Sequence, residues 1–221
     1  MSAPVRITVT SDFICPWCYI GENRLRLALE SLPEDIEIDV TWLPFELNPE
    51  MPSEGFDRRA YRSRKFGSWE HSRALDAKTV EAGAPEGVVF DYDAMTKTPN
   101  TMLAHRLSLF ARQQGRQTAF VEALFKAYFA EGRDIGDPEV LGDIARVIGL
   151  DRDAARVFLR GADLAVEVLA LERHAYEGGI NGVPHFEIGK HILHGAQPPE
   201  AIRRAILDAA AETRTAEGAV A

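Results

Sequence analysis

The chain changes its hydrophobic period at Cys15, and this change constrains the fold more than any other feature of the sequence. Apolar and polar residues alternate over residues 5–10, which predicts a β-strand. Over residues 16–32 the apolar positions recur at helical spacing, and Pro16 suits the first turn of that helix. A second alternating segment follows at residues 36–42, so the chain begins with a strand–helix–strand unit.

Residues 56–178 carry almost no strand signal, and we expect them to form a large all-helical insertion domain. Capping and stop residues divide this stretch into successive helices whose apolar faces must pack together. The expected helix starts are at Thr98-Pro99, Asp137-Pro138 and Asp151, and the expected ends are near Gly115, Gly149 and Gly161.

Strand patterns return after this stretch. Residues 183–188 and 192–193 predict a β-hairpin around a Gly-Lys turn, and Pro198-Pro199 starts a last helix. The predicted order is β-α-β, then helices, then β-β-α, which is an α/β domain with an insertion. We expect this domain to comprise residues 1–55 and 179–212, with residues 213–221 as a flexible tail.

The sequence contains two cysteines, Cys15 and Cys18, at the point where the first strand gives way to the first helix. Such a position places the first thiol beside unpaired backbone N–H groups and the positive end of the helix dipole. These surroundings lower the pKa of a thiol, and the thiolate is the form that attacks disulfides. We therefore predict that Cys15 is the nucleophile and Cys18 the resolving thiol, with Pro16 and Trp17 tuning the pair.

Pro184 is unusual because it stands at the start of a predicted strand. We interpret it as a cis-proline, with Val183 offering backbone hydrogen bonds to an extended substrate beside Cys15. His185 follows directly and would act on the same centre. A protonated imidazole would stabilise the thiolate, and a neutral one would relay a proton.

The charge of the chain argues against two classes of partner. Its formal net charge is −9, which leaves no basic surplus for nucleic acid or an anionic membrane surface. No segment approaches the roughly 18 apolar residues of a membrane span, and the N-terminus lacks the pattern of a secretion signal. These observations predict a cytoplasmic protein.

Other readings of the individual residues remain open. Cys15 and Cys18 would be half of a zinc site, but no histidine pair follows them at zinc-finger spacing, and no metal is expected. The basic residues within 58–65 suit a solvated helix face, or they steer an anionic substrate such as glutathione. Trp42 and Trp69 are expected in the core, whereas Trp17 either packs or contacts substrate.

Three segments together resemble the DsbA family, specifically its FrnE-like cytoplasmic branch. They are residues 12–21 (DFICPWCYIG), 182–186 (GVPHF) and 195–199 (GAQPP), and residues 99–107 and 131–135 extend the resemblance over nearly the whole chain. The resemblance implies a thioredoxin-like fold interrupted by a helical domain. It also implies that Cys15 and Cys18 are the redox pair and that Pro184 is the cis-proline opposite them.

The chain departs from this family pattern at two points. His185 stands where a small polar residue, often threonine, is expected after the cis-proline. The additional cysteine pair of some family members is absent, which excludes any mechanism that needs a second disulfide.

Our first functional hypothesis is a thiol–disulfide oxidoreductase that needs no metal or organic cofactor. Its partners would be disulfide- or thiol-containing proteins, or glutathione as a co-substrate, and it would be a monomer or a homodimer. We expect Trp17, Val183, Asn100 and His105 to contact the substrate.

The alternative enzyme is a glutathione-dependent transferase or isomerase similar to the kappa-type glutathione transferases and the 2-hydroxychromene-2-carboxylate isomerases. That sister group generally uses serine near position 15, so the two cysteines argue against it. A third hypothesis is a binding module or holdase, whose activity would survive the change Cys15→Ser.

Overall fold

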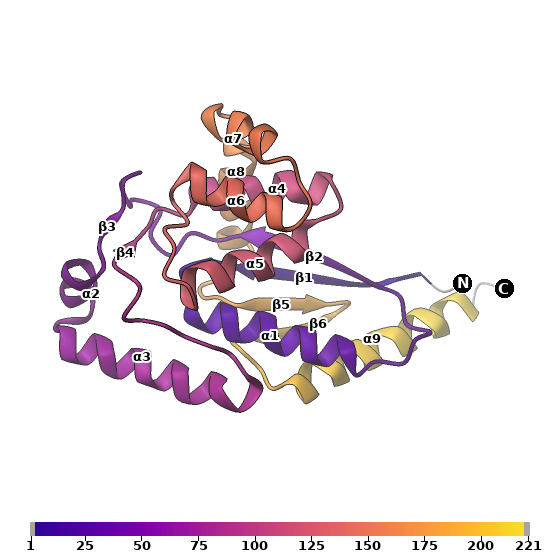
Figure 1. Cartoon of the computed structure of the whole chain (residues 1–221). Coiled ribbons are helices and arrows are strands. Elements are labelled where there is room, and N and C mark those ends of the chain that lie inside the picture. The colour runs from indigo at the N-terminus through magenta and orange to yellow at the C-terminus, as the bar shows by residue number, and fades with distance from the viewer. Residues whose placement is uncertain (1–2, 219–221) are drawn as a thin grey trace.

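The computed structural model describes residues 3–218, which form a central sheet surrounded by helices (Figure 1). The sheet has the strand order β2-β1-β5-β6, with β1 parallel to β2 and antiparallel to β5. In this register Val9 pairs with Trp42 on one side and with Phe186 on the other, and all three side chains are buried. The four strands are β1 (Val5–Ser11), β2 (Ile38–Pro44), β5 (His185–Ile188) and β6 (His191–His194).

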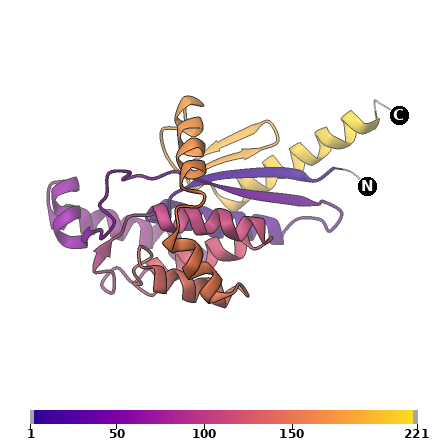
Figure 2. The same ribbon diagram turned by 90° about the horizontal axis from the view of Figure 1, so that it is seen from above.

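Two helices from opposite ends of the chain pack against each other beside this sheet. They are α1 (Pro16–Glu30) and α9 (Pro199–Gly218), and α9 also contacts β1, β5 and β6. Figure 2 shows α9 passing beside the β5–β6 hairpin. The predicted β-α-β and β-β-α units are therefore confirmed, with small differences at the ends of the elements.

The flexible tail predicted from residue 213 is wrong for residues 213–218, because α9 continues through them to Gly218. The preceding Ala-Ala-Ala-Glu run, residues 209–212, has high helix propensity. Arg214 also pairs with Asp35 at 3.1 Å, which holds this end of the helix to the rest of the domain. Residues 219–221 lie outside the described part of the chain.

The stretch between the two halves of the sheet is mainly helical, as predicted. Its helices are α2 (Arg58–Phe66), α3 (Trp69–Gly83), α4 (Met102–Gln113), α5 (Gln117–Phe129), α6 (Pro138–Val147), α7 (Arg152–Arg160) and α8 (Ala165–Glu177), with a 3₁₀ turn at Ala84–Glu86. Asp137 and Asp151 cap α6 and α7 as expected, each accepting a backbone N–H at 2.8 Å.

Two expectations for this stretch are wrong. It is not all-helical, because the short strands β3 (Phe56–Asp57) and β4 (Lys97–Thr98) pair in an antiparallel manner. Thr98 therefore lies in a strand, and α4 begins after Thr101 instead. The Asn100 side chain supports this start of the helix, since its Oδ1 accepts the N–H of Met102 at 2.9 Å.

Aromatic contacts join the helical stretch to the sheet domain. The Tyr19 ring on α1 stacks on Phe125 and Phe129 of α5, with centroid distances of 5.7 and 5.5 Å. Trp42 is buried as predicted, and its indole N–H donates to Thr118 at 3.2 Å. Trp69 was expected in the core but is half-buried, because it lies against the guanidinium groups of the neighbouring basic helix.

Gly21 provides a test of how α1 packs on the loop that precedes β5. An added Cβ would lie 2.9 Å from Cγ of Pro184 and 3.2 Å from Cζ of Phe186. We expect Gly21→Ala to lower the free energy of unfolding by about 1–2 kcal/mol, because overpacking outweighs the gain in helix propensity. Urea unfolding measures this change.

Gly182→Ala is the matched control, because no atom lies within 4 Å of its added Cβ. Its free energy of unfolding should change by less than about 0.5 kcal/mol. A Gly21→Ala protein as stable as the wild type would contradict the close packing of α1 on Pro184.

Candidate active site

Cys15 is the residue that caps the N-terminus of α1, as the sequence predicted. Its backbone is extended (φ −89°, ψ 113°), and Pro16 occupies the first turn. The carbonyl of Cys15 accepts the backbone N–H groups of Cys18 and Tyr19 at 3.0 and 3.3 Å. The side chain of Cys15 caps no N–H group, so its sulfur is left beside the positive end of the helix dipole.

Cys18 lies one turn further along α1 and is 1% exposed, against 5% for Cys15. Both cysteines are free thiols, and their side chains lie near each other. Burial raises the pKa of the Cys18 thiol well above its ordinary value, and the neighbouring Cys15 raises it further. Cys18 is therefore a protonated thiol at neutral pH.

The loop before β5 supplies the other side of the site. The Val183–Pro184 peptide bond is cis, and the Sγ of Cys15 lies 3.7 Å from the carbonyl oxygen of Val183, which is 168 residues away in the sequence. Trp17, between the two cysteines, has 41% of its surface exposed. Cys15, Trp17 and Val183 thus share one edge of the molecule.

His185 is turned into the β5–β6 hairpin. Its Nδ1 lies 3.2 Å from Nδ1 of His194, and its Nε2 lies 3.4 Å from a carboxylate oxygen of Glu187. Burial lowers the pKa of His185, and the Glu187 carboxylate partly opposes this effect. At neutral pH the imidazole is therefore neutral, which argues against stabilisation of the thiolate by charge. Among the described residues, the polar contacts of the ring are with His194 and Glu187 and not with either cysteine.

A cluster of buried acidic residues lies under the loop that carries Cys15, and the sequence analysis missed it. Oδ1 of Asp12 is 3.4 Å from Nε2 of His105, and its Oδ2 accepts the N–H of Leu47 at 2.7 Å. Glu172 accepts the N–H of Glu46 at 2.7 Å. In the sequence, only the position of Asp12 directly before the cysteine motif could have indicated this cluster. Glu46 and Glu172 lie 126 residues apart, so no sequence pattern links them.

Burial raises the pKa of Glu46 to about 7, with His105 opposing this shift and the carboxylates of Glu172 and Asp12 adding to it. Burial also raises the pKa of Glu172. Glu46 therefore keeps its proton up to a higher pH than the same carboxyl group would in water.

Asn100 and His105, both expected to contact substrate, are engaged in structural contacts. The Asn100 amide donates to the carbonyl of Met51 at 2.8 Å and caps the start of α4. His105 is 2% exposed and its ring lies 4.7 Å from that of Phe13. The placement of these two residues gives no support to a role in substrate binding.

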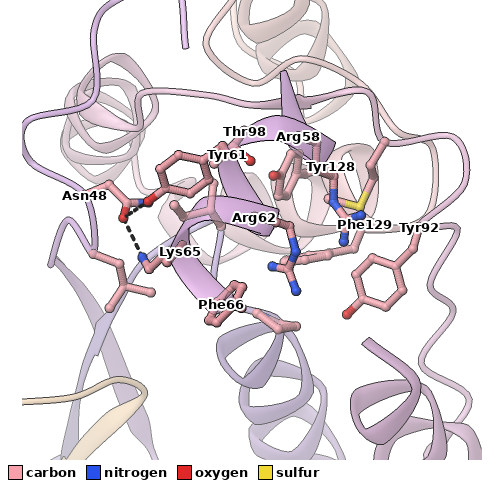
Figure 3. A pocket seen from close by; sticks show the side chains of 14 residues that line it. Asn48, Arg58, Tyr61, Arg62, Lys65, Phe66, Tyr92, Thr98, Tyr128 and Phe129 are labelled. Atoms are coloured by element: carbon pink, nitrogen blue, oxygen red, sulfur yellow. Dashed lines mark hydrogen bonds between the residues drawn. The ribbon is translucent and has the colours of Figure 1, made fainter. Parts of the chain in front are cut away.

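A cavity of about 100 Å³ adjoins the cysteine motif, with Ile14 and Pro16 in its wall (Figure 3). Arg58 and Arg62 of α2 also line it. The expectation that these arginines belong to a solvated helix face is wrong, because Arg58 is 3% exposed and both donate to the buried carboxylate of Asp76. Asp76 on α3 belongs to no recognisable sequence motif, so the sequence did not predict this pairing.

Over the described residues 3–218, the structure brings together no group of three or more His, Cys, Asp or Glu side chains able to hold a metal ion. Within the same residues, no helix is long and apolar enough to cross a membrane.

The fold and the paired thiols define the class of protein: a thioredoxin-like domain with a Cys-x-x-Cys site opposite a cis-proline. The family model of the DSBA-like thioredoxin domain matches residues 6–207. The chain therefore belongs to this family, as its motifs suggested.

Individual relatives agree with this assignment. The chain is 30% identical to the uncharacterized protein YwbO of Bacillus subtilis over 205 residues, which is 92% of this chain and 96% of YwbO. The crystal structure of probable DsbA oxidoreductase SCO1869 from Streptomyces coelicolor superposes with a TM-score of 0.84 and 32% identity, covering 93% of this chain and 89% of that one. A shorter match, 30% identity over 101 residues, relates 46% of this chain to 52% of the 2-hydroxychromene-2-carboxylate isomerase of Sphingobium xenophagum.

Glu46 gives the site a measurable pH dependence. Its pKa is about 7 in the folded protein and near 4.5 without the surrounding protein, so the folded protein retains a proton that the unfolded chain releases between these pH values. The free energy of unfolding should therefore fall as the pH rises through this window. We expect Glu46→Gln to remove about 2–3 kcal/mol of that decline, since its amide does not titrate.

Chemical denaturation of wild type and variant at several pH values between 4.5 and 7.5 measures this difference. Glu50→Gln removes an exposed carboxylate from the loop that follows β2 and is the matched control. Parallel pH profiles for the wild type and Glu46→Gln would show that Glu46 is ionised in the folded protein.

Proposed function

We propose that this protein is a thiol–disulfide oxidoreductase in which Cys15 is the nucleophile and Cys18 the resolving thiol. The observation that carries this proposal is the position of the two free thiols. Cys15 caps α1 and faces the Val183 carbonyl, while Cys18 is buried behind it with a raised pKa. Membership of the DSBA-like family supports the same chemistry.

The reaction follows from this asymmetry. The Cys15 thiolate attacks one sulfur of a substrate disulfide, so that a mixed disulfide forms and the other substrate sulfur leaves as a thiolate. Cys18 then loses its proton and attacks the Cys15 sulfur, which releases the second substrate thiol and leaves a Cys15–Cys18 disulfide. Two electrons pass from the cysteine pair to the substrate, and the reverse sequence oxidises a substrate dithiol.

The surroundings of the thiols fit these steps. The backbone of Val183 lies next to the Cys15 sulfur, and Trp17 is exposed beside it, which supports the proposal that the two residues bind an extended substrate segment. Pro16 and Trp17 occupy the first turn of α1 and set the environment of both sulfurs.

Exchange between sulfurs moves the electrons directly, so the proposed reaction uses no metal or organic cofactor. We propose that the partners are proteins or small molecules that carry a disulfide or thiols, including glutathione. A reducing compartment such as the cytoplasm keeps a free cysteine pair of this kind available for exchange.

The second candidate is a glutathione-dependent isomerase or transferase. The partial match to a 2-hydroxychromene-2-carboxylate isomerase favours it, together with the cavity next to Pro16. In that reaction Cys15 would polarise bound glutathione and Cys18 would have no chemical role.

Replacement of Cys18 separates the two candidates. With the resolving thiol removed, Cys18→Ala should accumulate a stable mixed disulfide between Cys15 and the substrate. We expect multiple-turnover disulfide exchange to fall by a factor of at least about 100, since the second step has no attacking sulfur. Mass spectrometry under non-reducing conditions, after addition of oxidised glutathione or a disulfide-bonded peptide, detects the adduct.

Cys15→Ser is the control and should form no adduct through Cys18, which is protonated and 1% exposed. A Cys18→Ala protein that keeps wild-type turnover without an adduct would exclude the dithiol reaction. It would then favour the glutathione-dependent isomerase.

A further inference from the structure

The cavity beside the cysteine motif has an unusual combination of a cationic wall and an apolar wall. Its described lining includes three cations, Arg58, Arg62 and Lys65, and no acidic side chain. Figure 3 shows the guanidinium of Arg62 between the rings of Phe66 and Tyr92. A cavity that is lined in this way favours an anionic group attached to an apolar body.

The charges around the cavity do not cancel. Arg58 and Arg62 share one carboxylate, that of Asp76, at 2.7 and 2.6 Å. One of the two guanidinium charges is therefore left without a counter-charge, and Lys65 at the rim adds another, since its ammonium bonds only to the neutral amide oxygen of Asn48 at 2.6 Å among the described residues.

The guanidinium of Arg62 has a nitrogen that is available to donate a further hydrogen bond. Its Nε donates to Ser72 at 2.7 Å and its Nη2 to Asp76, but Nη1 has no acceptor within the described part of the chain. Burial lowers the pKa of Arg62, so this guanidinium is held in surroundings that compensate its charge only in part. An anion at Nη1 would complete that compensation.

The remaining walls limit what this anion can be. Phe66, Met95 and Phe129 supply apolar surface, and the volume of about 100 Å³ is smaller than a cavity that holds benzene, about 150 Å³. A carboxylate on a short stem fits this space, whereas a polyanion does not, and an apolar or aromatic body attached to that stem would lie at the opening of the cavity. Because Ile14 and Pro16 form part of the wall, the rest of such a ligand would extend past the residues on either side of Cys15.

We propose that this cavity is a carboxylate-binding site, which gives the enzyme a preference for low-molecular-mass disulfides or thiols that carry a carboxylate on an apolar or aromatic stem. Arg62 binds the carboxylate, Lys65 attracts it at the rim, and the ligand's sulfur is thereby held next to Cys15. The substrate preference rests on the proposed dithiol exchange, but the binding site itself does not.

Binding can be tested without any thiol chemistry, with the Cys15→Ser protein and two matched probes. The probes are 3-phenylpropanoate and its neutral amide, 3-phenylpropanamide, titrated by isothermal calorimetry or by NMR shifts. We expect the carboxylate to bind at least about tenfold more tightly than the amide, because a charge-assisted hydrogen bond to a buried guanidinium distinguishes them. Arg62→Gln, added to Cys15→Ser, should abolish this difference.

Arg64→Gln is the matched control, because it removes the same charge from the same helix at an exposed residue that does not line the cavity. It should keep the preference for the carboxylate. Lys65→Gln is a second test at a rim position that cannot disturb the buried Asp76 pairs, and it should weaken carboxylate binding about two- to fivefold. Equal binding of the two probes would overturn the proposed site. Equal losses of carboxylate binding in Arg62→Gln and Arg64→Gln would overturn it as well.

Exchange kinetics test the substrate preference in the protein with both cysteines present. Arg62→Gln should raise KM about tenfold for 5,5′-dithiobis(2-nitrobenzoate), which carries carboxylates, and leave KM for the neutral 4,4′-dithiodipyridine unchanged. If Arg62→Gln raised KM by the same factor for a protein disulfide flanked by acidic side chains, the assignment to small molecules would be wrong. Probe binding without exchange of any disulfide would uphold the site and reject the oxidoreductase function.

Discussion

The contact between the start of α1 and the Val183–Pro184 loop is the constraint on which the rest of the site depends. It exists because β1 lies between β2 and β5, so that Thr10 at the end of β1 pairs with His185 at the start of β5. Cys15 follows the end of β1 and Val183 precedes the start of the antiparallel β5, so both residues lie at the same edge of the sheet. Gly21 lets α1 approach Pro184 closely enough to keep this arrangement.

The helical stretch is more than a cover for the sheet. Through α4 it places His105 against Asp12, and through α8 it brings Glu172 to the backbone of Glu46, so three acidic side chains are buried under the cysteine loop. Stacking of Tyr19 on α5 holds α1 to the same layer. The cysteine pair therefore lies at a junction whose polar groups are shielded from water, and this burial raises the pKa of Cys18, Glu46 and Glu172.

The same principle explains the cavity next to the cysteines. Two guanidinium groups share Asp76 because α3 folds back on α2, and this pairing leaves one positive charge partly buried beside apolar walls. A site of this kind selects its ligand by charge and shape together, since the cations bind a carboxylate and the small apolar space excludes bulkier anions.

The sequence by itself determined the order of the elements and the place of the cysteine pair at the junction of β1 and α1. Hydrophobic periods and caps are local signals, so β1, α1, β2, the hairpin, α6 and α7 could be located from neighbouring residues alone. The cis bond before Pro184 was also predictable, because a proline at that position in a strand is locally anomalous.

Only the tertiary structure decided which distant groups meet. The sharing of Asp76 by two arginines, the acidic cluster at Asp12 and the engagement of Asn100 in the loop before α4 all depend on contacts between separate elements. The length of α9 and the half-burial of Trp69 likewise depend on what packs against them. Side-chain environment, and hence charge state and accessibility, arises from packing between segments that the local sequence does not encode.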